Sequence, residues 1–319
     1  IGPQAELARL LCENSFADKV FFANSGSESI EAAIKLARRY FSSQGVGRAN
    51  IISMEKSFHG RTFAALAATA QKKVQKGFEP HLQEFTYVPF GDVEAVRNAI
   101  TPNTAAVLLE PVQGEGGVNI APGEFLKDLK VLLKEAGILL IYDEVQVGMG
   151  RTGKLFAYEH YGVTPDIMTL AKGLANGMPI GAMLATDEVA QAFTPGTHAS
   201  TFGGNPLSAA AGFATLSAML DEGVLENAVK LGAYLKEKLE GLKGRYGFIK
   251  EIRAMGLIIG MEIDMPGAPI VMRALEEGLL INCTADTVLR FLPPLIISTD
   301  DVDEMIHILS SIFDEQEMK

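Results

Sequence analysis

Two residues of opposite charge follow two apolar runs in the sequence. Asp143 comes directly after Ile138-Leu-Leu-Ile-Tyr, and Lys172 comes directly after Thr169-Leu-Ala. Short aliphatic runs bounded by turn residues predict strands buried on both faces of a parallel sheet. Ligands bind to such sheets outside the carboxyl ends of the strands. We therefore expect both charged side chains to lie at a ligand site, with the lysine desolvated and easily deprotonated.

One cofactor needs both charges. Pyridoxal phosphate takes a lysine on its aldehyde and an acid on its pyridinium nitrogen, which keeps the ring an electron sink. The alternative is that Asp143 and Lys172 are unrelated, each paired with another group at its own strand end, because buried charges are rare unless they are paired or functional. A separate phosphate site in the chain would favour the cofactor.

Such a phosphate site is predicted near the start of the sequence. A short strand at residues 19–23 runs into Asn24-Ser-Gly-Ser-Glu28 and then into a helix. Ser25 with Glu28 matches the Ser-x-x-Glu capping box. Backbone N–H groups and hydroxyls at a helix N-terminus bind anions, which makes Ser25, Gly26 and Ser27 candidates for the phosphate. The alternative is that these residues only cap the helix.

Strands and helices alternate through the first two-thirds of the chain. This alternation predicts an α/β fold with a mostly parallel, doubly wound sheet, which we assign to a large domain over residues 1–218. Further strands are expected at residues 51–54, 104–109, 138–142 and 167–170, and helices at residues 1–14, 125–135, 206–220 and 224–242. Strands at residues 248–253, 256–263 and 288–291 and a helix at 300–313 predict a small C-terminal α+β domain over residues 219–319.

Composition excludes several classes of function. The chain has 319 residues, of which 21% are charged, and its net charge of −11 argues against non-specific binding to nucleic acid. The sequence contains no apolar run of membrane-spanning length, so we expect no membrane partner. We also expect a cytoplasmic location, and the sequence leaves targeting to an organelle open. The five histidines have no metal-ligand spacing, and we expect no metal. Of these, His59 either lines the pocket or packs in the core.

Eight motifs resemble those of fold-type-I, class-III aminotransferases, in the family's order and over essentially the whole chain. Their sequences most resemble those of the ornithine and N-acetylornithine branch of this family. The motifs are Asn24-Ser-Gly-Ser-Glu with Lys35-Leu-Ala-Arg38, Phe58-His-Gly-Arg-Thr62, Glu110-Pro-Val-Gln-Gly-Glu115, Asp143-Glu-Val-Gln146, Gly148-Met-Gly-Arg-Thr-Gly153, Ala171-Lys-Gly173, Thr201-Phe-Gly-Gly-Asn-Pro206 and Leu289-Arg-Phe-Leu-Pro-Pro294.

The resemblance implies an enzyme with pyridoxal 5'-phosphate bound. Lys172 would hold the cofactor aldehyde and, once freed, move the proton, while Asp143 would hold the pyridinium proton. The other implied contacts are Val145 and Phe58 on the two ring faces, Gln146 on the phenolic oxygen, Ser25, Gly26 and Ser27 on the phosphate, and Thr201 on the phosphate of the neighbouring subunit in a homodimer. Alternatively, Phe58 is core packing and Thr201 caps the helix that begins near Pro206.

The resemblance also implies the substrates. Arg290 would grip the α-carboxylate of glutamate or 2-oxoglutarate and pair with Glu115 when a substrate with a distal amine is bound, while Arg61 would serve the other carboxylate. We expect Arg151 to be structural and Glu110 to support either an arginine or loop geometry.

The expected reaction moves the terminal amine of N-acetylornithine to 2-oxoglutarate, giving an aldehyde and glutamate in arginine biosynthesis. The alternatives are ornithine, 4-aminobutyrate, succinylornithine or succinyl-diaminopimelate as donor. Members of the family normally have a further N-terminal segment before the point where this sequence begins, so a cofactor-binding fragment with impaired catalysis is a further alternative.

Overall fold

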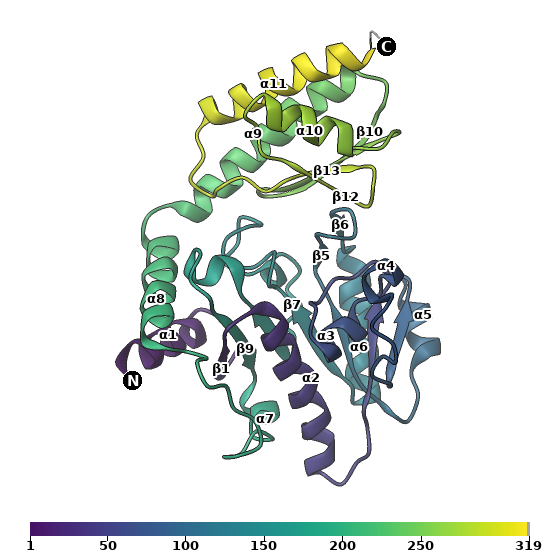
Figure 1. Ribbon diagram of the computed structural model, residues 1–319. Helices are drawn as coiled ribbons and strands as arrows, with labels where there is room; N and C mark the ends of the chain where they lie inside the picture. The colour runs from purple at the N-terminus through teal and green to yellow at the C-terminus, as the bar shows by residue number, and fades with distance from the viewer. Residues whose placement is uncertain (318–319) are drawn as a thin grey trace. The chain divides into compact units, whose positions relative to one another are not determined.

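A computed structural model describes residues 1–317 and divides them into two compact units. The first unit comprises Ile1–Pro111, Ala121–Met149 and Phe156–Ala218. The second begins at Met219 and also takes in Val112–Ile120 and Gly150–Leu155, two segments that lie far earlier in the sequence. Each unit has a sheet and hydrophobic core of its own. Figure 1 shows the course of the chain.

The first unit is built on a seven-stranded sheet that confirms the predicted α/β class. Its neighbouring strands all run parallel except β9, which is antiparallel to the strands on both its sides. In spatial order the strands are β1 (Lys19–Ala23), β9 (Gly181–Ala185), β8 (Ile167–Leu170), β7 (Leu139–Asp143), β4 (Thr104–Leu109), β2 (Asn50–Met54) and β3 (Phe85–Val88).

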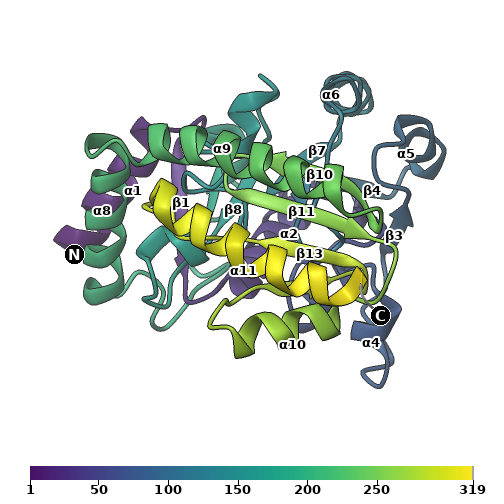
Figure 2. The ribbon, with the colours of Figure 1, turned by 90° about the horizontal axis from the view of Figure 1, so that it is seen from above.

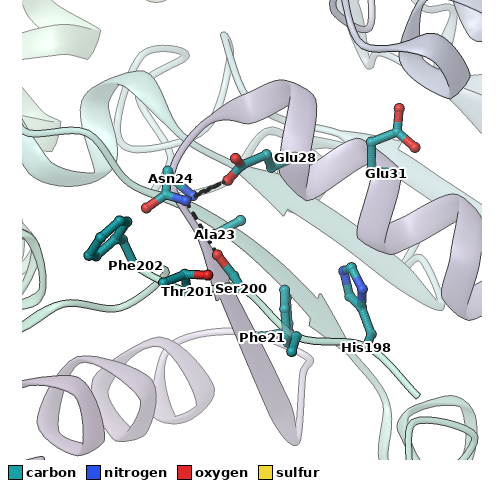
Figure 3. Close-up of a pocket in the computed structure, with 10 residues that line it drawn as sticks. Phe21, Ala23, Asn24, Glu28, Glu31, His198, Ser200, Thr201 and Phe202 are labelled. Carbon is teal, nitrogen blue, oxygen red and sulfur yellow. Dashed lines mark hydrogen bonds between the residues drawn. The ribbon is translucent and has the colours of Figure 1, made fainter. Parts of the chain in front are cut away.

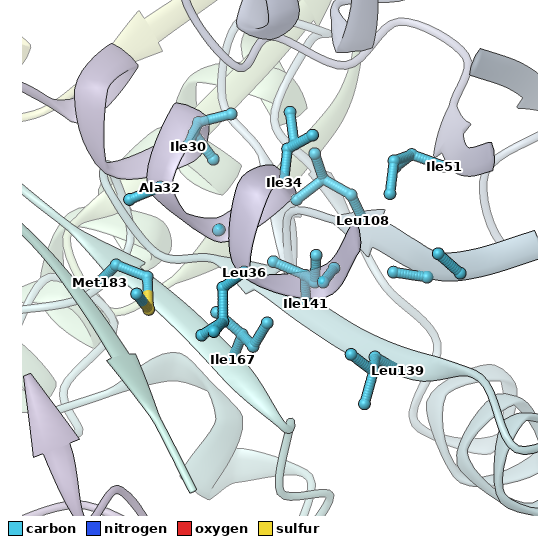
Figure 4. Packing of buried hydrophobic residues seen from close by; sticks show 14 of the residues in the cluster. Ile30, Ala32, Ile34, Leu36, Ile51, Leu108, Leu139, Ile141, Ile167 and Met183 are labelled. Atoms are coloured by element: carbon cyan, nitrogen blue, oxygen red, sulfur yellow. The ribbon is translucent and has the colours of Figure 1, made fainter. Parts of the chain in front are cut away.

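Helices cover both faces of this sheet because its central strands are apolar on both sides. Leu139 and Ile141 of β7 pack with α2 (Gly26–Ser43) and α3 (Phe63–Ala68) in one core cluster, part of which is drawn in Figure 4. Leu140 and Tyr142 pack on the other face with α5 (Val93–Ala99) and α6 (Gly123–Ala136). This alternation follows the two-residue period of a strand. It leaves the strand ends, rather than the strand faces, for polar groups.

Shorter elements complete the first unit. They are α1 (Gly2–Glu13), α4 (Lys72–Gln75), α7 (Asp187–Ala190) and the 3-10 turns η1 (Ala157–His160) and η2 (Lys172–Ala175). Helix α8 (Pro206–Asp221) runs from the first unit into the second.

The second unit contains a four-stranded antiparallel sheet. Its spatial order is β10 (Ile249–Met255), β11 (Ile258–Ile263), β13 (Val288–Phe291) and β12 (Asn282–Thr284). Helices α9 (Val224–Arg245), α10 (Ala268–Glu276) and α11 (Thr299–Glu317) lie over one face of this sheet (Figures 1 and 2). The two-stranded hairpin of β5 (Val112–Gln113) and β6 (Asn119–Ile120) belongs to the same unit.

Most elements expected from the sequence are present within one to three residues of their predicted ends. The sequence did not predict strands β3, β9 and β12, the β5–β6 hairpin, or helices α3, α4, α5, α7 and α10. No helix among residues 1–317 combines the length and apolar character that a membrane crossing requires.

Candidate active site

Asp143 and Lys172 follow neighbouring strands of the sheet. Asp143 is the last residue of β7, and its Cα lies opposite Thr169 of the parallel strand β8. Lys172 comes two residues after β8 ends at Leu170. Both residues therefore lie at the carboxyl edge of adjacent parallel strands, as their spacing predicted.

The Asp143 carboxylate is buried and held by three donors. His59 Nδ1 lies 2.7 Å from Oδ2, the Val145 backbone N–H donates to Oδ1 at 3.0 Å, and the Thr169 hydroxyl donates to Oδ1 at 3.4 Å. The sequence left His59 undecided between pocket and packing, and the structure places its fully buried side chain against Asp143. A proton on Nδ1 leaves a bare lone pair on Nε2, which has no partner among the described residues. This tautomer fixes the direction in which the carboxylate points.

Lys172 departs from the expectation of a desolvated lysine, because its side chain is exposed in this chain. Buried Ala171 leaves strand geometry with φ −166° and ψ −145°, and Lys172 then begins η2 in the left-handed region with φ +45°. That conformation costs a lysine on the order of 1–2 kcal/mol. It is held by its surroundings, since Leu174 in the same turn is also fully buried.

The predicted helix cap at the start of α2 is present with one difference. Ser25 is the N-cap and accepts a hydrogen bond from the Glu28 backbone N–H at 3.2 Å. The Glu28 carboxylate, however, accepts from Asn24, through its backbone N–H at 2.5 Å and its side-chain amide at 3.0 Å, instead of closing the box on Ser25. The acid therefore ties the end of β1 to the helix. The exposed Ser25 hydroxyl lies at the positive end of the helix dipole.

The start of α2 meets both strand ends at one glycine. A Cβ on Gly26 would lie 2.8 Å from Val145 Cγ1 and 3.5 Å from Ala171 Cβ. Val145 is the second residue after Asp143, and Ala171 directly precedes Lys172. The candidate phosphate loop, the candidate ring acid and the candidate lysine therefore converge, and only a residue without a side chain fits between them. Val145 and the following Gln146 are both half-buried.

Residues 58–61 form a second segment that contacts the start of α2. Gly60 has φ +133°, and a Cβ there would collide with Ser27 Oγ. Ser27 Oγ in turn accepts the Arg61 backbone N–H at 3.2 Å. The exposed Arg61 guanidinium lies 5.7 Å from the centre of the half-buried Phe58 ring. Buried Glu110 accepts the Phe58 backbone N–H at 3.1 Å, which is the loop support expected of this acid.

Glu144 is the most strongly perturbed acid next to the site. It is 1% exposed, and its two oxygens accept the backbone N–H groups of Ala157 at 2.6 Å and Tyr158 at 2.8 Å. Burial raises the pKa of Glu144 to about 8 although these two hydrogen bonds act to lower it. Burial also raises the pKa of the neighbouring phenol Tyr142, to which Glu144 adds a repulsive charge.

Thr201 lies in a cavity of about 430 Å³ beside the α2 N-terminus (Figure 3). It is exposed, and its neighbour Ser200 accepts a hydrogen bond from the Asn24 side chain at 3.3 Å. The alternative that Thr201 caps α8 is wrong, because Asn205 accepts the Ser208 backbone N–H at 3.0 Å in that position. Phe202, next to Thr201, is 71% exposed.

Glu115 and Arg290 form an ion pair within the second unit. Glu115 Oε1 lies 2.7 Å from Arg290 Nη1, with side-chain exposures of 34% and 6%. Arg151, in the same unit, is structural as expected. Its Nη1 donates to the backbone oxygens of Leu257 at 3.0 Å and Pro293 at 2.5 Å, and burial lowers its pKa to about 10.

Comparison with known proteins assigns this arrangement to a family. The model of the family described as "Aminotransferase class-III" matches residues 1–313. The chain belongs to the class-III aminotransferases. Members of this family are pyridoxal phosphate-dependent transaminases, which confirms the predicted enzyme class and cofactor.

Individual relatives are similar over nearly the whole chain. An acetylornithine aminotransferase from Caldanaerobacter subterraneus subsp. tengcongensis is 53% identical over 98% of this chain and 80% of its own length. One from Methanocaldococcus jannaschii is 51% identical over 98% of this chain and 79% of its own length. The crystal structure of the ornithine aminotransferase from Toxoplasma gondii superposes with a TM-score of 0.94 at 34% identity, covering 99% of this chain and 77% of that one.

The residues of this class-III aminotransferase fit pyridoxal phosphate. A buried carboxylate held by three donors suits the pyridinium nitrogen, and a helix N-terminus with exposed Ser25 suits the phosphate. Because Gly26 has no side chain, the start of α2 can approach Val145 and Ala171 closely, which brings these two sites together. Lys172 is an exposed residue that follows the strand next to Asp143, and its amine is the group that would bind the aldehyde.

Proposed function

We propose that this enzyme transfers the terminal amine of N-acetylornithine to 2-oxoglutarate, giving an aldehyde and glutamate in arginine biosynthesis. The identity of about half of all residues to acetylornithine aminotransferases from a bacterium and an archaeon carries this proposal. The second candidate donor is ornithine, favoured by the superposition on an ornithine aminotransferase at 34% identity.

The roles proposed for the chain's residues follow from the contacts of the site. Pyridoxal phosphate, when bound, supplies an electron sink that stabilises negative charge at the substrate carbon. Asp143 holds the pyridinium proton, because His59 and two further donors fix its carboxylate in place. Lys172 binds the aldehyde and, once released, moves the proton at the substrate carbon, for which its exposed position at the strand end gives access.

The remaining cofactor contacts are proposed from the same convergence. Ser25, Gly26 and Ser27 bind the phosphate at the start of α2, and Gln146 donates to the phenolic oxygen. Val145, which packs beside Gly26, covers one ring face, and Phe58 covers the other. Arg61, held against Phe58 and Ser27, binds the distal carboxylate of 2-oxoglutarate.

The Glu115–Arg290 pair is proposed to let one site accept two kinds of substrate. With an amine-ended donor, Glu115 and Arg290 stay paired, so the positive charge of Arg290 is neutralised and does not repel the donor's amine. A dicarboxylate replaces Glu115 on the guanidinium, which matches a carboxylate geometrically. Glu115 has room to leave because about a third of its side chain is exposed.

We also propose a homodimer in which Thr201 reaches the phosphate site of the neighbouring subunit. Exposed Thr201 is flanked by two large exposed apolar side chains, Phe202 at 71% and Leu207 at 68%, which a second copy would cover. The two-domain division after residue 218 and a cytoplasmic location remain predictions from the sequence.

A donor screen with 2-oxoglutarate tests the proposal. N-acetylornithine, ornithine and 4-aminobutyrate are compared by kcat/KM, with glutamate formation as the common readout. N-acetylornithine should give the highest value. Lys172→Ala is the control and should abolish both glutamate formation and the absorbance band of the lysine–cofactor linkage. A higher kcat/KM for another donor would replace the proposed substrate, and full activity of the lysine variant would refute the proposed mechanism.

A further inference from the structure

Four residues form a row across the small sheet at the position of Arg290. In the strand register, Arg290 of β13 lies opposite Gly260 of β11 on one side and opposite Asn282 of β12 on the other. Gly260 in turn lies opposite Arg253 of β10. Residues directly opposite each other in an antiparallel pair project from the same face. Arg290 therefore has an amide side chain on one flank and no side chain on the other.

Two neighbours use different nitrogens of the Arg290 guanidinium. Nη1 donates to Glu115 Oε1 at 2.7 Å, and Nε donates to Asn282 Oδ1 at 3.2 Å. A ligand carboxylate that takes the place of Glu115 on Nη1 would leave the Asn282 contact intact. Asn282 also carries no charge, so it orients the guanidinium without neutralising it.

The backbone of the loop that carries Glu115 is fixed independently of its carboxylate. The Thr284 hydroxyl donates to the Glu115 carbonyl, and Arg253 donates to the Gly117 carbonyl from Nη2 at 2.7 Å and from Nε at 3.2 Å. Thr284 belongs to the same strand as Asn282. The Glu115 side chain can therefore leave Arg290 by rotation alone, while the loop and the arginine stay in place.

We infer that Asn282 is a positioning residue that keeps the Arg290 guanidinium oriented toward a substrate carboxylate when Glu115 is displaced, and that does so without neutralising its charge. This inference rests on the proposed role of Arg290. The selectivity then depends on three residues: Glu115, a charged acceptor that leaves, Asn282, a neutral acceptor that stays, and Arg290, the cation between them. A neutral acceptor is required because a second permanent acid would cancel the charge that attracts the dicarboxylate.

Glutarate, a dicarboxylate that cannot be transaminated, is the probe for this inference. Its affinity for the holoenzyme is measured by titration calorimetry in Asn282→Leu, Asn282→Asp and Arg290→Ala. Asn282→Leu should weaken glutarate binding about tenfold, since it removes one hydrogen bond to a charged group. Asn282→Asp should weaken binding by at least about the same factor through its charge, although it keeps the shape of asparagine. In the transamination assay both variants should raise KM for 2-oxoglutarate far more than they lower kcat.

Cys283→Ala is the matched control, because it changes the same strand on the opposite face and should leave glutarate affinity within about twofold of wild type. Thermal midpoints of all variants show whether the fold is kept, and if Asn282→Leu fails to fold, the isosteric aspartate variant decides the matter. If both Asn282 variants bind glutarate with wild-type affinity while Arg290→Ala abolishes binding, the inference about Asn282 is overturned and the proposed role of Arg290 is kept. Wild-type affinity in Asn282→Asp with weak binding in Asn282→Leu would also overturn it, since shape alone would then suffice. Wild-type affinity in Arg290→Ala would overturn the proposed role of Arg290 as well.

Discussion

Replacing Glu144 by glutamine should change how the stability of the protein depends on pH. The carboxyl group is 1% exposed, and its pKa rises from an ordinary 4.5 to about 8 because burial disfavours the charged form. Asp143, Glu159 and the phenols of Tyr142, Tyr158 and Tyr161 are the titratable groups that interact with it. None of these supplies a compensating positive charge.

The sign and size of the effect follow from proton linkage. Between pH 4.5 and about 8 the folded protein keeps the Glu144 proton, which the unfolded chain has released. Stability therefore falls as pH rises through this window, by at most about 1.4 kcal/mol per pH unit. Glutamine does not titrate and loses one of two backbone hydrogen bonds, at a cost of about 1 kcal/mol that is the same at every pH.

The measured quantity is the free energy of unfolding from urea titrations at pH 5.5, 6.5 and 7.5. Relative to wild type, Glu144→Gln should gain about 2 to 3 kcal/mol between the lowest and the highest of these pH values. Exposed Glu124 provides the control, since Glu124→Gln removes one negative charge without a buried partner and should change the difference by less than about 0.5 kcal/mol. A constant offset between Glu144→Gln and wild type across the pH range would refute the burial argument.

Three further predictions concern the site. Gly60→Ala should weaken pyridoxal phosphate binding at least about tenfold by cofactor titration, because its Cβ would displace Ser27 and because φ +133° disfavours any side chain; unchanged affinity would show that residue 60 does not set the loop. His59→Leu should lower kcat about tenfold to a hundredfold and shift the absorbance of the bound cofactor, since Asp143 loses a buried donor; an unaltered spectrum would contradict this. Glu115→Gln should tighten glutarate binding about tenfold by removing a competing charge from its arginine partner, and unchanged or weaker binding would contradict the proposed exchange.

Much of the first unit could be predicted from the sequence because its signals are local. Aliphatic runs such as residues 104–109 and 167–170 mark buried parallel strands exactly where β4 and β8 occur. Asp143 and Lys172 could be placed at the same sheet edge because parallel strands share their carboxyl ends. Strand β9 was missed because Gly181-Ala-Met-Leu-Ala185 has little β-branched or alternating character.

Other features depend on contacts that a sequence does not display. His59 and Asp143 are 84 positions apart, so nothing local showed that one would orient the other. The exposure of Lys172 depends on the left-handed turn that follows Ala171, and lysine is not a residue type that signals such a turn. The Asn282 contact with Arg290 arises from the register of β12 on β13, which the hydrophobic pattern of a three-residue strand cannot specify.

The position of β1 at one end of the large sheet has a consequence for synthesis of the protein. Its partner is β9, with Phe21 opposite Met183, so the strand that leads into the Ser25–Ser27 loop pairs with a segment translated much later. Contacts of such high sequence separation form late in folding. A nascent chain stalled on the ribosome before residue 181 should therefore fail to retain pyridoxal phosphate, and a chain extended past residue 185 and free of the exit tunnel should be the first to capture it.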